Sequence, residues 1–297
     1  MNFVPHRRHV KNLLLVVLAA LASNEFLRRA VPTSTAAAAQ KPSLTASTMP
    51  FEVGERLTYN VSWKVFDAGI ATMTLAERTS FQNEDTYRIN ATVYSTGIVS
   101  ALFKVVDVFE SFFQARDLCS RRITKKIQEG RRHRETVVTF DAKAHRAQME
   151  DRDLNRPDLP PKRSESPLPS CVQDVISALY VIRTKTLRVG ELVQFPINDG
   201  GRTYDVTVEI QAQEEVRTPA GTFQAFRLEP KVFDGLFKSK GRLFVWVTTD
   251  TARIPVQLKA KINIGTITAV LTQADHVPVP PHRSPAKLPT RAQTRAD

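Results

Sequence analysis

The chain has 297 residues, of which 42% are apolar and 24% are charged, and its formal net charge is +12. This apolar content is enough for a packed core and excludes an intrinsically disordered protein. The length allows either one large β domain or two small ones.

The first 22 residues have the three parts of a secretory signal peptide. Three basic residues precede an apolar run at 13–21, which ends in the small-x-small cleavage site Ala20-Leu-Ala22. The run is too short for a membrane-spanning helix, which needs about 20 apolar residues. The cleavage site has no cysteine, so we expect no lipid anchor there. We therefore expect export to the periplasm or outer envelope, a mature start near Ser23, and no nucleic-acid partner despite the positive charge.

Composition divides the rest of the chain into three parts. Residues 23–50 are rich in Ala, Ser, Thr and Pro, and residues 276–297 hold five prolines and four basic residues. These compositions predict a flexible linker and a basic, disordered tail. Residues 51–275 are predicted to form a single β-rich domain, whose halves at 51–150 and 185–275 are joined by a loop and a helix.

Both halves alternate apolar and polar residues, which is the pattern of strands with one buried face. Leu57, Tyr59, Val61 and Trp63 begin a hairpin expected over 56–76, with its turn at Asp67-Ala-Gly69. Further strands are expected at 87–94, 105–114, 121–128, 134–140, 192–197, 204–210, 223–228, 243–248, 254–262 and 267–272. So many short strands predict a mainly β fold, an antiparallel, two-halved barrel or sandwich.

One helix is predicted, at about 170–183, after a proline-rich loop at 151–169. Val172, Val175, Ile176 and Leu179 recur at helical spacing, and Ser170 with Gln173 forms a capping-box pair. We expect Leu179→Asp to unfold the domain and Ser177→Asp to be tolerated on the opposite face.

The two halves share short motifs at nearly constant offsets. Val53-Gly-Glu55 recurs as Val189-Gly-Glu191, and Leu102-Phe-Lys104 recurs as Leu236-Phe-Lys238. Two similar β modules would produce this pattern, and so would independent strands of similar composition.

Cys119 and Cys171 are the only cysteines. In an exported chain, such a pair is expected to be bridged. The bond would close a loop of about 50 residues, contribute roughly 4 kcal/mol, and attach the helix to the end of a strand. The alternative is two separate, buried thiols.

Four motifs, taken in order, resemble an exported bacterial family. They are Pro50-Phe-x-x-Gly-Glu-x-Leu-x-Tyr-x-Val-x-Trp63, Cys171-Val-x-Asp-x-x-Ser-Ala-Leu-Tyr180, Thr218-Pro-Ala-Gly-Thr-Phe223 and Val245-Trp-x-Thr-x-Asp-x-x-Arg-Ile-Pro255. Together they resemble domain-of-unknown-function family 3108 over residues 50 to about 274. The resemblance implies a β-rich envelope protein and carries no catalytic or binding residues over to this chain.

No catalytic, metal or cofactor motif is present in the sequence. His133 and His145 lack partners at metal-ligand spacing, and no nucleophile elbow, phosphate-binding loop or dinucleotide fingerprint occurs. Asp174 is either a buried functional carboxylate or, as we favour, a residue of the first helical turn. We expect no cofactor, no metal and no catalytic residue.

Basic residues are concentrated on the hairpin expected around Gly130. Such a patch would hold an anionic membrane surface or an anionic envelope polymer; the alternative is a solvated face with an edge protected by charge. The candidate anion-binding residues are Arg121, Arg122, Lys125, Lys126, Arg131, Arg132 and Arg134.

Two apolar stretches, at 97–103 and 233–237, break the alternation at matching places in the two halves. If they line a mouth of the barrel, the sheet would enclose a hydrophobic ligand; if they only pack its end, it would not. The candidate mouth residues are Ile98, Val99, Leu102, Phe103, Phe233, Leu236 and Phe237.

The sequence therefore predicts a non-enzymatic module that binds a hydrophobic or anionic component of the envelope. The first alternative is a structural or protein-interaction module. The second is an enzyme whose site has no local motif.

Overall fold

The computed structural model describes residues 49–232, 241–262 and 265–278. The predicted signal peptide, nearly all of the linker and most of the tail lie outside these ranges. The described strands are β1 Arg56–Trp63, β2 Phe66–Phe81, β3 Glu84–Ser95, β4 Val106–Gln114, β5 Ser120–Glu129, β6 Arg132–Asp141, β7 Arg146–Asp153, β8 Lys162–Pro167, β9 Leu192–Asp199, β10 Arg202–Thr218, β11 Gly221–Val232, β12 Arg242–Thr248, β13 Pro255–Ile262 and β14 Gly265–Asp275.

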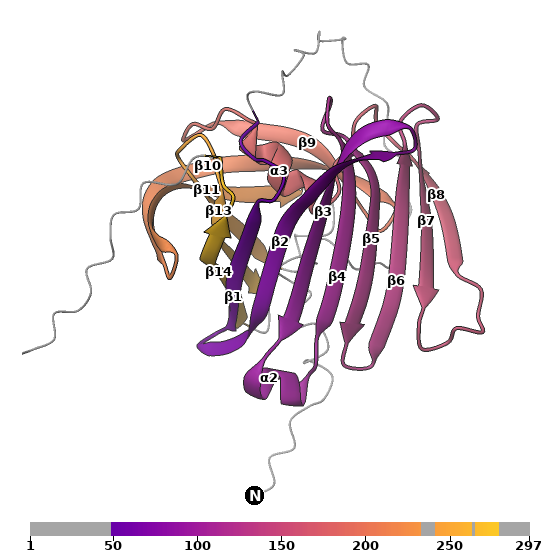
Figure 1. Cartoon of the computed structure of the whole chain (residues 1–297), viewed down its shortest axis with the longest axis horizontal. Helices are drawn as coiled ribbons and strands as arrows, with labels where there is room; N and C mark the ends of the chain where they lie inside the picture. The colour runs from indigo at the N-terminus through magenta and orange to yellow at the C-terminus, as the bar shows by residue number, and fades with distance from the viewer. Residues whose placement is uncertain (1–48, 233–240, 263–264, 279–297) are drawn as a thin grey trace, which may run out of the picture.

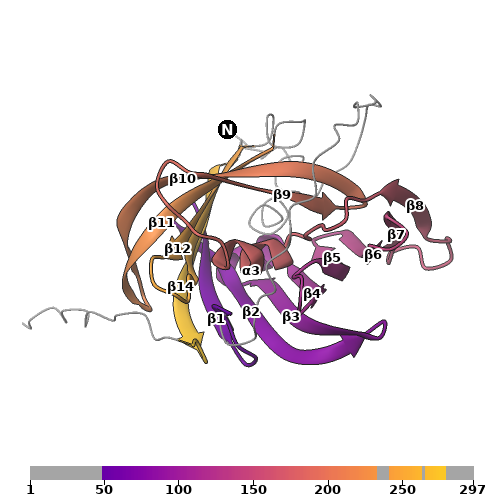
Figure 2. The same ribbon diagram turned by 90° about the horizontal axis from the view of Figure 1, so that it is seen from above.

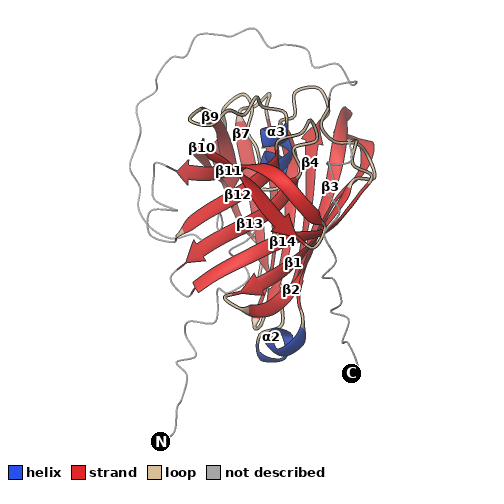
Figure 3. Cartoon of the chain, turned by 90° about the vertical axis from the view of Figure 1, so that its left-hand side faces the viewer, coloured by secondary structure: helices blue, strands red, loops and turns tan. Residues whose placement is uncertain are grey.

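The strands form one antiparallel sheet in the order β8-β7-β6-β5-β4-β3-β2-β1-β14-β13-β12-β11-β10-β9. Neighbours in the sheet are consecutive in the chain, except that β1 pairs with β14. The sheet curls into a barrel-like ring, and β8 and β9 are its two edges (Figures 1 and 3). The predicted mainly β, antiparallel fold is confirmed, and the single curled sheet resembles a barrel rather than a sandwich.

The two halves begin with the same local structure. Gly54 has a φ of +96° and Gly190 a φ of +89°, a backbone region that glycine adopts readily. The Gly54 amide donates to the Leu75 carbonyl at 2.9 Å, and the Gly190 amide donates to the Ile210 carbonyl at 2.8 Å. The repeated Val-Gly-Glu motif therefore makes the same turn before β1 and before β9, as two similar modules would.

In the described part of the chain, two short helices accompany the sheet. Helix α2 spans Gly97–Leu102 and connects β3 to β4, so the first apolar stretch that breaks the strand alternation is helical. Helix α3 spans Ser177–Arg183 and lies inside the ring of strands (Figure 2). The end of the barrel that carries α2 is called the α2 end below.

The predicted helix at 170–183 is half as long in the structure. Residues before Ser177 are held by strands instead: the Gln173 amide donates to the Pro196 carbonyl at 2.9 Å, and the Asn198 amide donates to the Gln173 carbonyl at 2.7 Å. On the other side, the Ser120 amide donates to the Val172 carbonyl at 2.9 Å. The segment thus crosses the interior between β5 and β9, and these bonds replace the first helical turns.

Aromatic side chains fill the interior of the first half. The Phe51 ring lies 5.1 Å from that of Tyr180 on α3 and 5.8 Å from that of Tyr87 on β3, in edge-to-face geometry. Phe113 on β4 lies 6.0 Å from Tyr180. All four residues are buried, so α3 is part of the core.

Candidate functional site

The disulfide prediction is confirmed. Cys119 and Cys171 are bonded, their Cα atoms are 5.2 Å apart, and 52 positions separate them in the sequence. The bond lies where the chain leaves β8 and enters the interior beside the start of β5. It therefore fastens the crossing segment to the sheet.

Asp174 organises the start of α3. One carboxylate oxygen accepts bonds from the Ser111 and Ser120 hydroxyls at 2.6 and 2.8 Å, and the other accepts from the Ile176 and Ser177 amides at 2.7 and 3.0 Å. Both oxygens are used to cap the helix and tie it to β4 and β5. These contacts are those of a structural cap, and they leave no free lone pair aimed at a ligand.

The expectation that Ser177 lies on the face away from the core is wrong. The Ser177 side chain is fully buried, and its hydroxyl donates to Gln173 Oε1 at 2.9 Å. A carboxylate there would be buried next to that of Asp174 without a counter-ion. Leu179, in contrast, is only half-buried, and the unfolding expected of Leu179→Asp stays a prediction.

A buried ion pair between Arg183 and Glu55 joins three segments. Two guanidinium nitrogens lie 2.6 Å from the two carboxylate oxygens, and both side chains are 0% exposed. The guanidinium also donates to the Pro50 carbonyl at 2.7 Å and the Ala252 carbonyl at 3.0 Å. Burial opposes the charge, but the bonds to Glu55 outweigh it and leave the pKa of Arg183 raised. The pair thus holds α3, the entry to β1 and the β12–β13 turn together.

The structure does not gather the seven predicted anion-binding residues on one surface. Strand alternation points Arg121 and Lys125 inward, where Arg121 pairs with Glu84 and Asp117, and Lys125 pairs with Asp199. Arg134 pairs with Asp151, and Lys126 pairs with Glu135. Arg131 and Arg132 are exposed in the β5–β6 turn, and Arg132 lies 3.8 Å from Glu129. Binding of an anion by this set stays a prediction.

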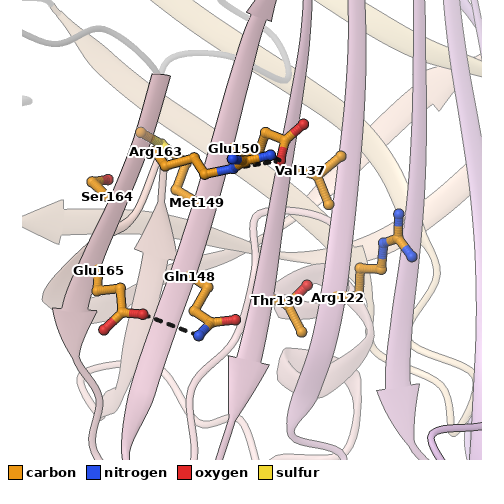
Figure 4. Close-up of a pocket in the computed structure, with 9 residues that line it drawn as sticks. All are labelled: Arg122, Val137, Thr139, Gln148, Met149, Glu150, Arg163, Ser164 and Glu165. Atoms are coloured by element: carbon orange, nitrogen blue, oxygen red, sulfur yellow. Dashed lines mark hydrogen bonds and ion pairs between the residues drawn. The ribbon is translucent and has the colours of Figure 1, made fainter. Parts of the chain in front are cut away.

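Arg122, the remaining member of the set, lines an open groove over β5–β8 (Figure 4). The groove has a volume of about 660 Å³. Arg163 lies 3.0 Å from Glu150 across it, and the Gln148 amide donates to Glu165 at 3.1 Å. The lining holds two arginines and two glutamates, so its formal charges balance, and Arg122 has no carboxylate within ion-pair distance among the described residues.

Two carboxyl groups are buried together near the α2 end. Asp107 on β4 is 3% exposed and Glu129 on β5 is 2% exposed, and neither Glu129 oxygen has a hydrogen-bond partner among the described residues. Burial raises the pKa of Asp107 to about 7; burial, and next the Asp107 charge, raise the pKa of Glu129 to about 8. Below about pH 7 both carboxyl groups are therefore mainly protonated in the folded protein.

We expect Glu129→Gln to stabilise the protein at alkaline pH only. A carboxyl group whose pKa is raised in the folded state binds its proton more tightly there than in the unfolded state. The free energy of unfolding therefore falls as the pH rises from the ordinary pKa to the folded-state pKa. The parent should lose stability between about pH 4.5 and pH 8, and the variant should lose less, by on the order of 2–4 kcal/mol. Urea denaturation at pH 5 and pH 9 measures this difference. Glu135→Gln on the outer face is the control, and an equal pH dependence in parent and Glu129→Gln would contradict the expectation.

An apolar cavity lies between α3 and the inner face of β9–β13. Its volume is about 70 Å³, and it is open on one side. All the lining residues are apolar: Val175, Ala178, Leu179, Ile182, Phe195, Ile197, Val206, Val208, Leu228, Pro230, Leu243, Val245 and Leu258. Leu179, Phe195, Pro230 and Leu243 are half-buried, so they form the open side.

The sequence did not predict this cavity. Its wall is assembled from five strands and α3, and each contributing residue reads as ordinary core. The predicted mouth residues lie elsewhere or outside the described ranges. Ile98 and Leu102 are exposed on α2, Val99 is buried and Phe103 is half-buried. Phe233, Leu236 and Phe237 fall in 233–240, outside the described residues.

The structure also bears on metal binding and membrane spanning. Among the described residues, no three His, Cys, Asp or Glu side chains are placed to hold a metal ion together. None of the described helices is long and apolar enough to cross a bilayer.

Three solved structures are similar to this chain. A beta-barrel-like protein of domain of unknown function DUF1849 from Brucella abortus has a TM-score of 0.53 and 10% sequence identity. A Bacteroides fragilis protein described as exported, with a YmcC-like fold, scores 0.33 at 10% identity, and a Parabacteroides distasonis protein described as a lipoprotein scores 0.32 at 9%. Each match covers 76% of this chain and 98% of the other. The first shows a shared barrel-like fold.

No curated protein matches the sequence. A family match does extend over residues 58–272, which spans β1 to β14 and contains both halves, α3 and the disulfide. The chain therefore belongs to the family described as Protein of unknown function (DUF3108).

Proposed function

We propose that this protein is an exported, non-enzymatic module that binds the apolar chain of an envelope molecule in the cavity beneath α3. The observation that carries the proposal is the lining of that cavity. All thirteen lining residues are apolar, with side chains from α3 facing side chains from β9–β13. A site with no polar partner holds water poorly, because each water needs two to four hydrogen-bond partners.

The dimensions favour the end of an acyl chain over a compact ring. The volume of about 70 Å³ is smaller than the 150 Å³ cavity that accepts benzene in an engineered protein. The cavity is open on the side where the half-buried Leu179 and Leu243 lie. A flexible chain can place its last carbons in the narrow part while the rest occupies the open side, where a headgroup stays in water.

Export is supported by the signal-like residues 1–22, and the periplasm or outer envelope is the compartment proposed. The disulfide agrees with this compartment, since such bonds persist in oxidising environments. An envelope of this kind supplies acyl chains as phospholipids and lipopolysaccharide or lipoprotein anchors, so the proposed ligand class is present where the protein would be.

We expect Leu179→Trp to reduce binding of an apolar probe at least tenfold, because the larger side chain fills the open side of the cavity. The probe is cis-parinaric acid, a linear acyl chain whose polyene fluorescence rises in apolar surroundings. The matched control is Leu192→Trp, which adds the same side chain at a position that is 60% exposed and outside the lining. Circular dichroism melts of both variants show whether the fold is kept.

Native mass spectrometry of the protein purified from its own envelope tests the ligand directly. A retained acyl-bearing molecule that Leu179→Trp loses and Leu192→Trp keeps is the expected result. Equal probe binding by parent and Leu179→Trp, or a parent that retains nothing and binds no probe, would overturn the proposal. The second outcome would favour the structural module, for which the filled aromatic interior of the first half also argues.

A further inference from the structure

Four large apolar side chains project into solvent from two adjacent turns at the α2 end. Ile98 and Leu102 on α2 are 78% and 80% exposed, and Val65 and Phe66 in the β1–β2 turn are 88% and 59% exposed. These four residues are called the apolar tip. The turns are neighbours, because the Thr96 amide donates to the Ala68 carbonyl at 3.0 Å (Figure 1). Single exposed apolar residues are ordinary, but a group of this size at one place marks an interaction site.

Three exposed cations and one exposed carboxylate, Asp67 beside Phe66, lie around the apolar tip. Lys64 precedes Val65, Lys104 follows α2, and Arg131 lies in the β5–β6 turn, which is attached to the end of α2 by a 2.8 Å bond from the Gly130 amide to the Lys104 carbonyl. Across the described residues, none of these three cations lies within ion-pair distance of a carboxylate. Most other exposed cations of the barrel, such as Arg78 and Arg146, do have such partners.

We propose that the α2 end docks on an anionic lipid bilayer, with the apolar tip inserted among the acyl chains and Lys64, Lys104 and Arg131 at the level of the headgroups. Apolar side chains flanked by basic residues are the arrangement by which interfacial segments bind such membranes. Trp63, at the end of β1, is two positions before Val65, and Tyr94 on β3 is four positions before Ile98. Tyr94 is 40% exposed. Tryptophan and tyrosine prefer the interface between water and lipid.

Charge distinguishes a bilayer from a second copy of the chain. Two copies that met through their apolar tips would bring both sets of unpaired cations together, and like charges oppose such a contact. The tip also projects from turns rather than lining a groove, so it suits insertion into a fluid layer. This proposal does not depend on the cavity beneath α3, which is lined by other residues.

The test is flotation of the mature chain, from Ser23 on, with phosphatidylcholine vesicles that either lack or contain 30% phosphatidylglycerol. The parent should float with the anionic vesicles and lose binding as salt is raised. Ile98→Ser with Leu102→Ser should lower the partition coefficient at least roughly tenfold, because two side chains no longer leave water. Lys104→Glu with Arg131→Glu should lower binding to anionic vesicles by at least roughly fivefold per charge.

The matched control is Val189→Ser with Leu192→Ser, which removes apolar side chains that are 53% and 60% exposed beside the start of β9. β9 lies across the end of the barrel opposite α2, so these residues are far from the apolar tip (Figures 1 and 3). This variant should bind like the parent. All variants keep the basic tail, so any difference reports on the mutated residues alone, and equal melting temperatures show that the fold is intact.

Trp63 supplies a second readout that a lost fold cannot imitate. With Trp246→Phe, which leaves Trp63 as the single tryptophan of the chain, the emission should shift to the blue and be quenched by brominated lipid on binding. Failure of the parent to float with either vesicle would overturn the proposal, and so would equal binding by Ile98→Ser with Leu102→Ser. Analytical ultracentrifugation tests whether a second copy of the chain binds the tip instead. A dimeric parent and a monomeric Ile98→Ser, Leu102→Ser variant would assign the tip to self-association.

Discussion

Arg183→Met is expected to destabilise the protein by about 3–5 kcal/mol, because it leaves the Glu55 carboxylate buried without its counter-ion. The guanidinium also satisfies the Pro50 and Ala252 carbonyls, and methionine can satisfy neither. Urea denaturation followed by circular dichroism measures the loss. Adding Glu55→Leu to Arg183→Met should recover part of it, since an apolar pair removes the isolated charge.

The internal similarity of the two halves supplies the control. Glu191 occupies in the second module the place that Glu55 occupies in the first, but it is exposed and lies 3.4 Å from Arg188. Arg188→Met should therefore change stability by less than about 1 kcal/mol, as exposed ion pairs do. If the free energy of unfolding of Arg183→Met lay within about 1 kcal/mol of that of the parent, the buried ion pair would not be what holds the three segments together.

Cys119→Ala with Cys171→Ala is expected to destabilise the protein by about 4 kcal/mol, as the chain-entropy model gives for a closed loop of this length. The loop contains β5–β8, and the bond also holds residues 171–176 in their extended path through the interior. A reducing agent should lower the melting temperature of the parent toward that of the variant. It should leave the variant itself unchanged, and a parent insensitive to reduction would contradict this role.

Strand alternation made most of the fold predictable. The runs around Leu57–Trp63 and Ile254–Ile262 carry apolar residues on one face only, so they read as strands whatever their partners are. The disulfide followed from the compartment and from a pair with a single possible pairing. What alternation could not provide was the order of the strands in the sheet, because the β1–β14 pair joins two strands about 200 positions apart in the sequence.

The helix was overextended because its first residues satisfy two patterns. Val172, Val175 and Ile176 fit a helical stripe, yet every residue from Val172 to Ala178 is buried, which removes the polar face that would have marked where the helix starts. The true cap is Asp174, whose serine partners lie on β4 and β5, more than 50 residues away in the sequence. Nothing local to the segment reveals them.

The polar residues of the interior were missed for a related reason. Arg121 and Lys125 share a strand face with Ile123 and Ile127, so alternation already placed them inside, but their charge was taken as a sign of the surface. Their partners Glu84 and Asp199 lie far away in the sequence. Arg183 had a local signal, since it continues the buried stripe from Ile176 through Tyr180, and Glu55 stood in the motif that opens the domain.

The pairing of β1 with β14 has a consequence for the order in which the sheet can form during synthesis. A chain that emerges from its N-terminus delivers β1 first and β14 last, while the other neighbouring strands of the described sheet emerge one after another. Consecutive hairpins can form as they appear, but the edge of β1 must wait for the final strand, some 200 positions later. Until then that edge is an open template for foreign strands, so the nascent chain is exposed to edge-to-edge aggregation until β14 has been synthesised.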